Sequence, residues 1–219
     1  MAKQERAVRT RNQLIASAAD TFRRCGFAEA SLTVIRDDAC VSSGALYFHF
    51  ANKAALASAV VDEAARILRA AARHMRHRPA PALQHLIDVT HGLAALLCEN
   101  VVAQAGFQLS RTGYGGPGPT LLQEWRECVT AMLAEAHHQG TLRRDVAPQD
   151  VSAMIVAMAV GFESLSREDQ SWLREPAITA FWKLQLPWLA APQALDGLMP
   201  EGSESTLSSL RRLLQLPRV

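Results

Sequence analysis

The sequence predicts an all-α protein with a small three-helix domain at its N-terminus and a larger helical body after it. Three observations support this prediction. Apolar residues recur at helical spacing along most of the 219-residue chain, Gly and Pro residues separate the periodic segments, and the alternation typical of half-buried strands is nearly absent. A hydrophobic content of 49% with 20% charged residues is ordinary for a globular protein that buries a sizeable core.

The first predicted helix covers residues 5–25. Its apolar residues lie three or four positions apart, and the arginines fall elsewhere on the helix. This apolar stripe consists of Leu14, Ile15, Ala18, Ala19 and Phe22. Gly26 follows the stripe, and because glycine readily adopts the left-handed conformation that ends helices, we expect the helix to stop there.

Two short helices joined by a tight turn follow. Ser31 or Thr33 can cap the first of them, which is expected to end near Ala39. Cys40–Val41–Ser42 forms the turn, and the next helix covers about residues 43–50. Three helices in some fifty residues, the last two joined tightly, predict a helix-turn-helix unit.

The remaining chain predicts further helices and one strong boundary. Asn52 is suited to cap a long helix over residues 53–77, which the prolines of Arg78–Pro79–Ala80–Pro81 end. Further helices are expected over residues 83–98, 101–109, 120–138, 147–165, 171–189 and 207–216, with a Gly/Pro loop at 113–119 and a polar linker at 192–205. We divide the chain into an N-terminal domain (1–52) and a body (53–219).

Charge and cysteine usage restrict the class of protein. The net charge is only +2, but residues 1–53 carry eight basic and five acidic residues, so the N-terminal domain is the basic part and suits an anionic partner. The four cysteines are widely spaced, which favours reduced thiols over disulfides or a zinc site. The N-terminus lacks a signal peptide pattern, and the longest apolar run is too short to cross a membrane. We therefore expect a cytoplasmic protein with no membrane partner.

The stretch Gly44–Ala45–Leu46–Tyr47–Phe48–His49–Phe50, followed by Asn52, Lys53 and Leu56, resembles the signature of TetR-family transcriptional repressors. The upstream segments Leu32–Thr33–Val34–Ile35 and Ala39–Cys40–Val41–Ser42 match the second helix and the turn of that family. In the body, Ala105–Gly106–Phe107–Gln108–Leu109 and Glu124–Trp125–Arg126 resemble the γ-butyrolactone autoregulator receptors of actinomycetes, as does the helix from Glu175–Pro176 to Pro187.

The resemblance implies that the third helix enters the major groove of operator DNA. The short residues at its start let the backbone approach the duplex, whereas Tyr47 and His49 reach phosphates or base edges. The predicted DNA-binding residues are Thr33, Ser42, Ser43, Gly44, Ala45, Tyr47, His49 and Lys53. We expect Leu46, Phe48 and Phe50 to be core residues. Arg6, Arg9 and Arg11 either reach DNA or lie in a solvated terminus.

Three residues depart from the family pattern. Cys40 stands where a turn glycine is usual, so the turn needs either another backbone route or a strained conformation. Arg36 replaces a small residue, which puts the packing of the second helix in doubt. Ser43 replaces a longer polar residue and removes one DNA contact. These differences affect the expected operator sequence and affinity.

The body is expected to hold a small-molecule cavity between its helices. The predicted lining residues are Trp125, Phe107, Leu86, Leu93, Val129, Met132 and Ile155. The resemblance implies that Trp125 packs on the ligand, and the alternative is a plain core tryptophan. Gln108, Thr90 and His91 are candidates for the polar contact to a lactone carbonyl. The apolar helices over 151–165 and 171–189 suit a homodimer, or else they are internal core.

The function expected from this resemblance is a ligand-responsive repressor that binds palindromic DNA as a dimer and is released by a γ-butyrolactone. Alternatives are a related regulator that senses an antibiotic or a furan, and a ligand-independent regulator. No catalytic motif occurs: Gly-x-Ser-x-Gly, Walker A and His-Glu-x-x-His are all absent, so no enzyme, cofactor or metal is expected. A protein–protein adaptor remains the other rival.

Overall fold

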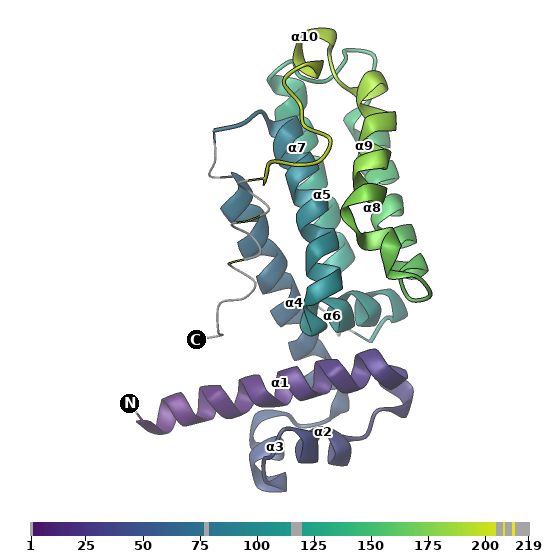
Figure 1. Cartoon of the computed structure of the whole chain (residues 1–219). Helices are drawn as coiled ribbons and strands as arrows, with labels where there is room; N and C mark the ends of the chain where they lie inside the picture. Colours follow the sequence, from purple (N-terminus) through teal and green to yellow (C-terminus); the bar gives the residue numbers. More distant parts are fainter. Residues whose placement is uncertain (1, 77–78, 115–119, 205–207, 209–211, 213–219) are drawn as a thin grey trace. The chain divides into compact units, whose positions relative to one another are not determined.

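The computed structural model describes residues 2–76, 79–114, 120–204, 208 and 212 (Figure 1). Over these ranges the protein is helical, and the one pairing of extended backbone is an isolated bridge between Leu142 and Ala190. The elements are α1 (Ala2–Glu29), α2 (Leu32–Asp38), α3 (Ser43–His49), α4 (Lys53–Arg76), α5 (Ala82–Glu99), α6 (Val101–Thr112), α7 (Leu121–His138), α8 (Pro148–Leu165), η1 (Gln170–Leu173), α9 (Glu175–Leu189) and α10 (Pro192–Leu195). The predicted all-α fold is confirmed.

The chain forms two compact units. Unit 1 contains Met1–Ile67 and Asn100–Leu122, and unit 2 contains Leu68–Glu99 and Gln123–Val219. Unit 1 thus joins the three N-terminal helices to the first part of α4 and to α6. The division at residue 53 concerns functional domains, and it stays a prediction.

The core of unit 1 begins with the predicted stripe of α1. Leu14, Ile15, Ala18, Ala19 and Phe22 are each at most 1% exposed. Gly26 has φ +76° and interrupts the helix, as the predicted stop requires, although a further turn carries α1 on to Glu29.

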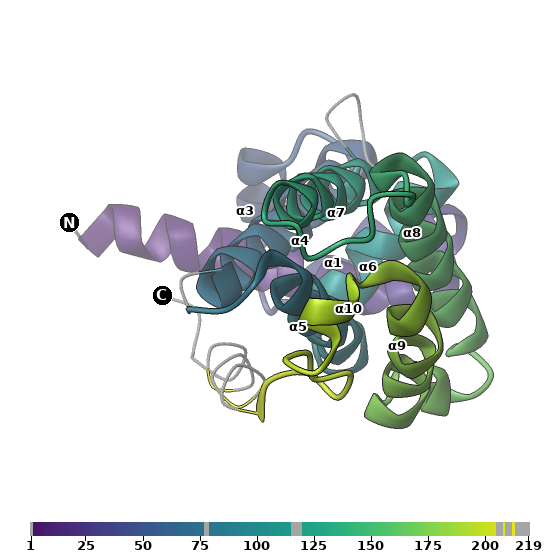
Figure 2. The same ribbon diagram turned by 90° about the horizontal axis from the view of Figure 1, so that it is seen from above.

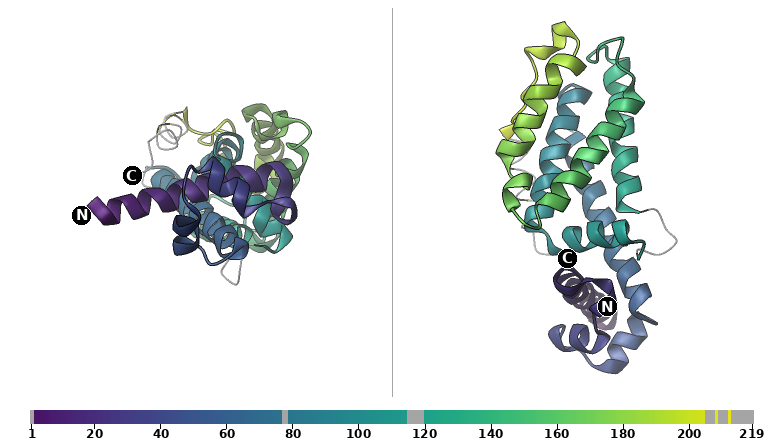
Figure 3. Two further views of the ribbon diagram at one scale, coloured as in Figure 1. Left: turned by 90° about the horizontal axis from the view of Figure 1, so that it is seen from below. Right: turned by 90° about the vertical axis from the view of Figure 1, so that its right-hand side faces the viewer.

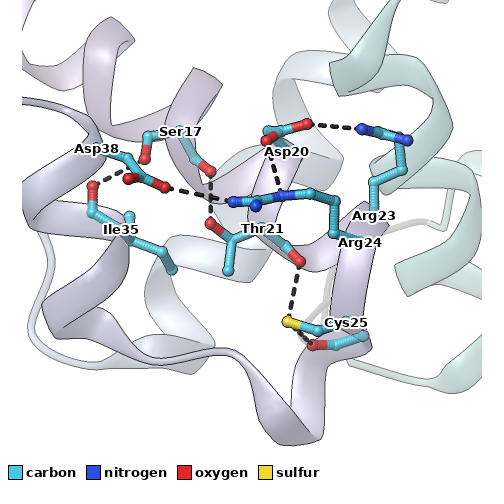
Figure 4. A network of polar contacts seen from close by, with 9 residues as sticks. Ser17, Asp20, Thr21, Arg23, Arg24, Cys25, Ile35 and Asp38 are labelled. Atoms are coloured by element: carbon cyan, nitrogen blue, oxygen red, sulfur yellow. Dashed lines mark hydrogen bonds and ion pairs between the residues drawn. The ribbon is translucent and has the colours of Figure 1, made fainter.

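Polar contacts join α1 to α2 (Figure 4). The Ser17 hydroxyl donates to the Ile35 carbonyl at 2.8 Å, and Arg24 forms ion pairs with both Asp20 and Asp38. Because Ile35 is itself fully buried, this hydrogen bond and the apolar contact hold α2 at one place along α1.

The α6 helix packs closely on the first part of α4 in unit 1. A Cβ atom added to Gly106 would lie 2.3 Å from the Cβ of Ala64, and it would also lie 3.6 Å from the Val60 carbonyl oxygen. Only glycine permits this approach, because real Cβ contacts are never so short. Asn100 starts α6 by accepting hydrogen bonds from the backbone N–H groups of Val102 and Ala103.

Unit 2 is a bundle in which α5, α7, α8 and α9 run roughly lengthwise beside one another (Figure 3, right), and Figure 2 views it nearly end-on. The α5 helix is its centre, since α8, η1 and α9 all contact it. Trp182 of α9 is fully buried and donates its indole N–H to the Thr90 hydroxyl at 2.7 Å. For the apolar residues of 171–189 a dimer surface and internal core were both open, and Trp182 is a core residue.

A polar edge of α5 holds the segment Met199–Ser203. Gln84 exchanges two hydrogen bonds with the backbone of Met199, Asp88 accepts from the Ser203 N–H at 2.7 Å, and His91 bonds to the Pro200 carbonyl at 2.9 Å. These three α5 side chains are at most 5% exposed, so the segment gives buried polar groups their partners.

Two predicted segments have a different form in the structure. The helix expected over residues 171–189 is split into η1 and α9 at Arg174, because Pro176 occupies the first turn of α9, where a missing N–H costs nothing. The short α10 lies in the expected linker. The helix expected over residues 207–216, apart from residues 208 and 212, and most of the Gly/Pro loop fall outside the described residues.

Candidate functional site

The turn between α2 and α3 is built by two serine caps and one strained residue. Ser31 caps α2 by accepting from the Thr33 N–H, and Ser42 caps α3 by accepting from the Ala45 N–H. Cys40 has φ +54°, the left-handed region that disfavours a side chain. The turn therefore keeps the geometry of a glycine turn without the glycine, which is the strained of the two expected routes.

The two faces of α3 differ sharply. Leu46 and Phe50 are 2% and 5% exposed and pack into unit 1, whereas Tyr47 and Phe48 are 61% and 80% exposed. The prediction that Phe48 is a core residue is wrong. Leu46 and Phe50 are four positions apart and share a helix face, but Phe48 lies two positions from each and therefore points to the opposite side.

The other residues predicted at this surface lie around the start of α3. Thr33, Ser42, Ser43 and Gly44 are exposed, while Ala45 and His49 are half-buried. A Cβ at Gly44 would meet no atom closer than 4.0 Å, so the backbone here faces open space. Ser43 accepts a hydrogen bond from Arg36 at 2.9 Å, and Arg36 also pairs with Asp37. Arg36 therefore links α2 to α3 and is accommodated at the surface rather than in the core.

Lys53, the last predicted DNA-binding residue, already has protein partners. Its ammonium donates to the carbonyls of Ala28 and Ala30, both at 2.9 Å, and lies 4.8 Å from the centre of the Phe27 ring. Phe27 in turn stacks on Tyr114 with ring centres 4.2 Å apart. Lys53 thus fastens the start of α4 to the end of α1, and a phosphate contact would use its third N–H.

The N-terminal part of α1 adds positive charge to unit 1. Arg6, Arg9 and Arg11 are exposed, and the Arg11 guanidinium lies over the Phe50 ring at 5.6 Å from its centre. Arg11 is thus held against a residue that anchors α3, so the N-terminal part of α1 places one cationic group beside α3.

Unit 2 contains a small apolar cavity, which we call the inner cavity. It is lined by Thr90, Leu93, Ala94, Leu97, Trp125, Met158, Ala159, Phe162, Leu173 and Ile178. Its volume of about 10 Å³ is about the least that one water molecule needs. Trp125 is fully buried, and its indole N–H has no hydrogen-bond partner in the described structure. A buried donor without a partner is costly, and it marks a position where an acceptor would be stabilising.

The predicted lining residues are placed as follows. Leu93 and Trp125 line the inner cavity. Leu86, Val129, Met132 and Ile155 are buried in unit 2 but do not line it, and Phe107 is a buried residue of unit 1. Their role in binding stays a prediction. The sequence pattern did not single out Leu97, Leu173 or Ile178, because one apolar residue of a buried helix looks like another.

Of the polar candidates, Thr90 lines the inner cavity, but its hydroxyl is already used. It donates to the Ile87 carbonyl at 2.7 Å and accepts from Trp182. His91 bonds to Pro200, and Gln108 belongs to unit 1. Among the residues of this lining, Trp125 is therefore the one whose side-chain N–H has no hydrogen-bond partner in the described structure. Glu124, the residue before it, forms an ion pair with Arg69 of α4 and keeps the start of α7 in place.

Metal-binding clusters and membrane-spanning helices are both absent from the described part of the chain. No group of three or more His, Cys, Asp or Glu side chains there is arranged to hold a metal ion. No single described helix is long and apolar enough to cross a membrane, and α5 and α6 reach that length only as a broken pair.

Both parts of the chain match known family models. Residues 14–60 match the model described as bacterial regulatory proteins of the tetR family, and residues 80–190 match the tetracyclin repressor-like C-terminal domain. The first match contains α2, the turn and α3. The second contains α5 to α9, including every residue of the inner cavity.

Whole-chain relatives agree with these models. The A-factor receptor protein of Streptomyces griseus is 33% identical over 204 residues, which cover 92% of this chain and 71% of that protein. A crystal structure of an ArpA-like gamma-butyrolactone receptor has a TM-score of 0.75 at 28% identity and covers 95% of this chain and 98% of its own. CprB from Streptomyces coelicolor, in complex with its biological operator sequence, has a TM-score of 0.74 at 29% identity, with coverages of 96% and 98%.

Proposed function

Because this chain belongs to the TetR family of bacterial transcriptional regulators, we propose that it is a cytoplasmic repressor that binds palindromic operator DNA as a homodimer and is released by a small apolar effector. The effector class that the relatives favour is a γ-butyrolactone, since gamma-butyrolactone receptors are among the similar structures. A related regulator that senses an antibiotic or a furan, or one that needs no ligand, is the alternative.

The observation that carries the proposal is the exposed side of α3. Two aromatic side chains, Tyr47 and Phe48, stand in solvent on a helix whose other side is anchored by Leu46 and Phe50. The Tyr47 hydroxyl suits a phosphate oxygen, and the Phe48 ring suits the methyl group of a thymine in the major groove. The open backbone at Gly44 allows the close approach that such contacts need.

Dimerisation is supported by apolar side chains on α9. Leu184 and Trp188 are 70% and 72% exposed and lie four positions apart, so they share one face of the helix. A two-fold axis that pairs this face with the same face of a second chain would bury Trp188 of each chain. The two copies of α3 would then occupy successive major grooves, about 34 Å apart along the duplex.

Effector sensing is supported by the inner cavity. A lactone carries an acceptor oxygen that suits the unpartnered Trp125 N–H, and apolar atoms that suit the remaining lining. Since the cavity holds about 10 Å³, an effector has to enlarge it, and only the shape with the enlarged cavity binds the effector well. The effector shifts the population toward that shape, and the shape favoured by DNA is depleted.

The test is fluorescence anisotropy with a labelled duplex from the region upstream of this protein's own gene. We expect binding that weakens steeply between about 50 and 200 mM salt, as phosphate contacts require, and that weakens again when an alkyl γ-butyrolactone is added. Trp125→Phe keeps the ring but loses the N–H, so it should bind DNA normally and release it only at higher lactone concentration.

The outcomes separate the parts of this proposal. Salt-independent binding to the duplex would argue against a DNA-binding regulator. Equal operator affinity with and without a series of lactones, antibiotics and furans would leave the ligand-independent regulator. Sedimentation of the complex shows whether two chains bind one duplex.

A further inference from the structure

Unit 2 contains a second hollow beside the inner cavity, which we call the outer groove. It has a volume of about 600 Å³, within the range of roughly 300–1,000 Å³ that is common for small-molecule sites. It is lined by His91, Ala94, Ala95, Cys98, Glu99, Gln170, Leu173, Arg174, Glu175 and Pro176. Ala94 and Leu173 line both hollows, so these two side chains form the wall between them.

The two hollows differ in chemistry. The lining of the inner cavity is almost entirely apolar, and Thr90 and Trp125 are its two residues that carry a polar N–H or O–H group. The outer groove has charged residues at its rim, Glu99, Arg174 and Glu175, and an imidazole, that of His91, in its lining. A molecule that fills both must therefore have an apolar part and a polar part.

The protonation of His91 defines what its ring can offer. The Pro200 carbonyl can only accept, so Nε2 of His91 carries the proton of their 2.9 Å hydrogen bond. Burial lowers the pKa of His91 more than the Pro200 hydrogen bond and the nearby carboxylates raise it, so the ring is neutral at pH 7. Its Nδ1 is then an acceptor, whereas Arg174 supplies donors and positive charge.

The wall between the hollows is thin and locally held. Ala94 contributes a single methyl group, and Leu173 is the last residue of η1, a four-residue 3₁₀ helix. Such helices have poorer hydrogen-bond geometry than α-helices, and η1 is a short connector between α8 and α9. η1 is held at its start by Asp169, which accepts from the Ser171 N–H and hydroxyl, and near its end by the Cys98 thiol, which donates to the Leu173 carbonyl at 3.7 Å.

We propose that the inner cavity and the outer groove are two halves of one effector site, with the Leu173 side chain as the gate between them. This inference rests on the proposed function. The effector is an amphipathic small molecule: its apolar ring or chain passes Ala94 and Leu173 and reaches Trp125, while its polar head stays in the groove. There Arg174 binds an anionic or accepting oxygen of the head, and His91 Nδ1 accepts from a hydroxyl.

The gate explains how a cavity of about 10 Å³ can still be a binding site. The groove offers enough space for the first encounter, and displacement of one leucine joins it to the cavity. Because the open state is a minor population, the gate reduces the apparent affinity for the effector by the fraction that is open. Removing the gate side chain should therefore tighten binding.

The probe for the test is 1-anilinonaphthalene-8-sulfonate, which has apolar rings and one anionic oxygen group. It is titrated into the full-length protein, with Leu173→Ala to open the gate, Ala95→Phe to fill the groove from a half-buried position, and Arg174→Gln to remove the charge. Leu189→Ala is the matched control, because Leu189 is also 6% exposed but lines neither hollow.

We expect one probe site per chain, bound about fivefold more tightly by Leu173→Ala and about fivefold more weakly by Arg174→Gln. Ala95→Phe should abolish binding, and Leu189→Ala should leave it unchanged. Thermal unfolding curves are recorded for all variants, to check that the probe fluorescence does not come from unfolded protein. If Ala95→Phe unfolds, Ala95→Leu takes its place.

Equal probe affinity in all four variants would overturn the two-part site. So would equal gains in Leu173→Ala and Leu189→Ala, since a general loosening of unit 2 would then be the cause. Operator binding by the unsubstituted protein is measured separately. If it is normal while the probe results fail, the effector site is wrong and the repressor stands, whereas absent operator binding contradicts the proposed function itself.

Discussion

At α3, two phenylalanines two positions apart have opposite environments, with Phe50 5% exposed and Phe48 80% exposed. An exposed phenyl ring contributes nothing to the free energy of folding, because its apolar area stays in water. Its contribution must then come from a partner outside this chain. Since the Tyr47 ring beside it is also exposed, these two side chains together form the contact surface that we propose on unit 1.

Phe48→Ala tests this assignment. We expect the free energy of unfolding to change by less than about 0.5 kcal/mol, because no buried contact is lost. Operator affinity should fall by about tenfold, most strongly for duplexes that have a thymine at the contacted position. Denaturant unfolding and anisotropy on duplexes with thymine replaced by uracil, which lacks the methyl group, measure the two effects.

Phe50→Ala is the contrasting variant, since its buried ring should cost about 3–5 kcal/mol of stability. A large loss of stability in Phe48→Ala with unchanged operator affinity would mean that Phe48 is a core residue and not a DNA contact.

Among the elements, the contact between α4 and α6 depends on one missing side chain. Gly106 lies where any Cβ would come within 2.3 Å of Ala64, so the two helices pack backbone to backbone in unit 1. In an exposed helix the same glycine would be a disadvantage of about 1 kcal/mol relative to alanine. The close approach offsets that disadvantage.

Gly106→Ala should therefore destabilise the protein, by about 1–3 kcal/mol in denaturant unfolding, although alanine is the better helix former. Gly161→Ala in α8 is the control, because nothing lies within 4 Å of the added Cβ and a neutral or stabilising change is expected. Adding Ala64→Gly to Gly106→Ala should recover part of the loss. Equal changes in stability at both glycines would show that helix propensity, and not the contact between α4 and α6, determines the effect of Gly106→Ala.

The helices could be predicted from local signals, and the tertiary contacts could not. The cap at Ser31, one of the two candidates, and the cap at Asn52, the stop at Gly26 and the buried stripe of α1 are all where residue spacing placed them. The role of Gly106 required its neighbour Ala64, which is 42 positions away in the sequence.

The candidate site shows the same limit. Its start at Ser42–Ser43–Gly44 followed from a short motif, but the exposure of Phe48 followed only from the angle between positions on a formed helix. The inner cavity draws its lining from five elements, and no local pattern tells a lining leucine from a core leucine.

For the whole molecule, the buried polar edge of α5 joins parts of the chain that are 115 residues apart. Gln84, Asp88 and His91 are all satisfied by the backbone of Met199–Ser203, and Lys183 adds an ion pair to Glu201 at 3.1 Å. Loss of any one of these hydrogen bonds would leave a buried polar group without a partner, at a cost of about 1–3 kcal/mol of stability. Folding of unit 2 is therefore coupled to the ordering of this late segment.

That coupling predicts a pH dependence of stability. Burial lowers the pKa of His91 below its ordinary value of 6.5, despite the hydrogen bond to Pro200 and the carboxylates of Glu175, Asp88 and Glu201. As the pH falls below 6.5, the unfolded chain therefore takes up the proton before the folded chain does, and the free energy of unfolding decreases until the folded pKa is passed. Well above pH 6.5 both states are neutral at this residue, so it adds no pH dependence there.

His91→Gln keeps a donor for the Pro200 carbonyl but cannot titrate. Denaturant unfolding between pH 5 and 8 should show a smaller loss of stability on acidification for His91→Gln than for the unsubstituted protein, and the two curves should become parallel well above pH 6.5. His138→Gln, at an exposed position of α7, serves as the control and should follow the unsubstituted curve. Parallel curves over the whole range would mean that His91 has the same pKa in the folded and the unfolded chain. They would contradict a buried, neutral His91 ring that holds Met199–Ser203 through Pro200.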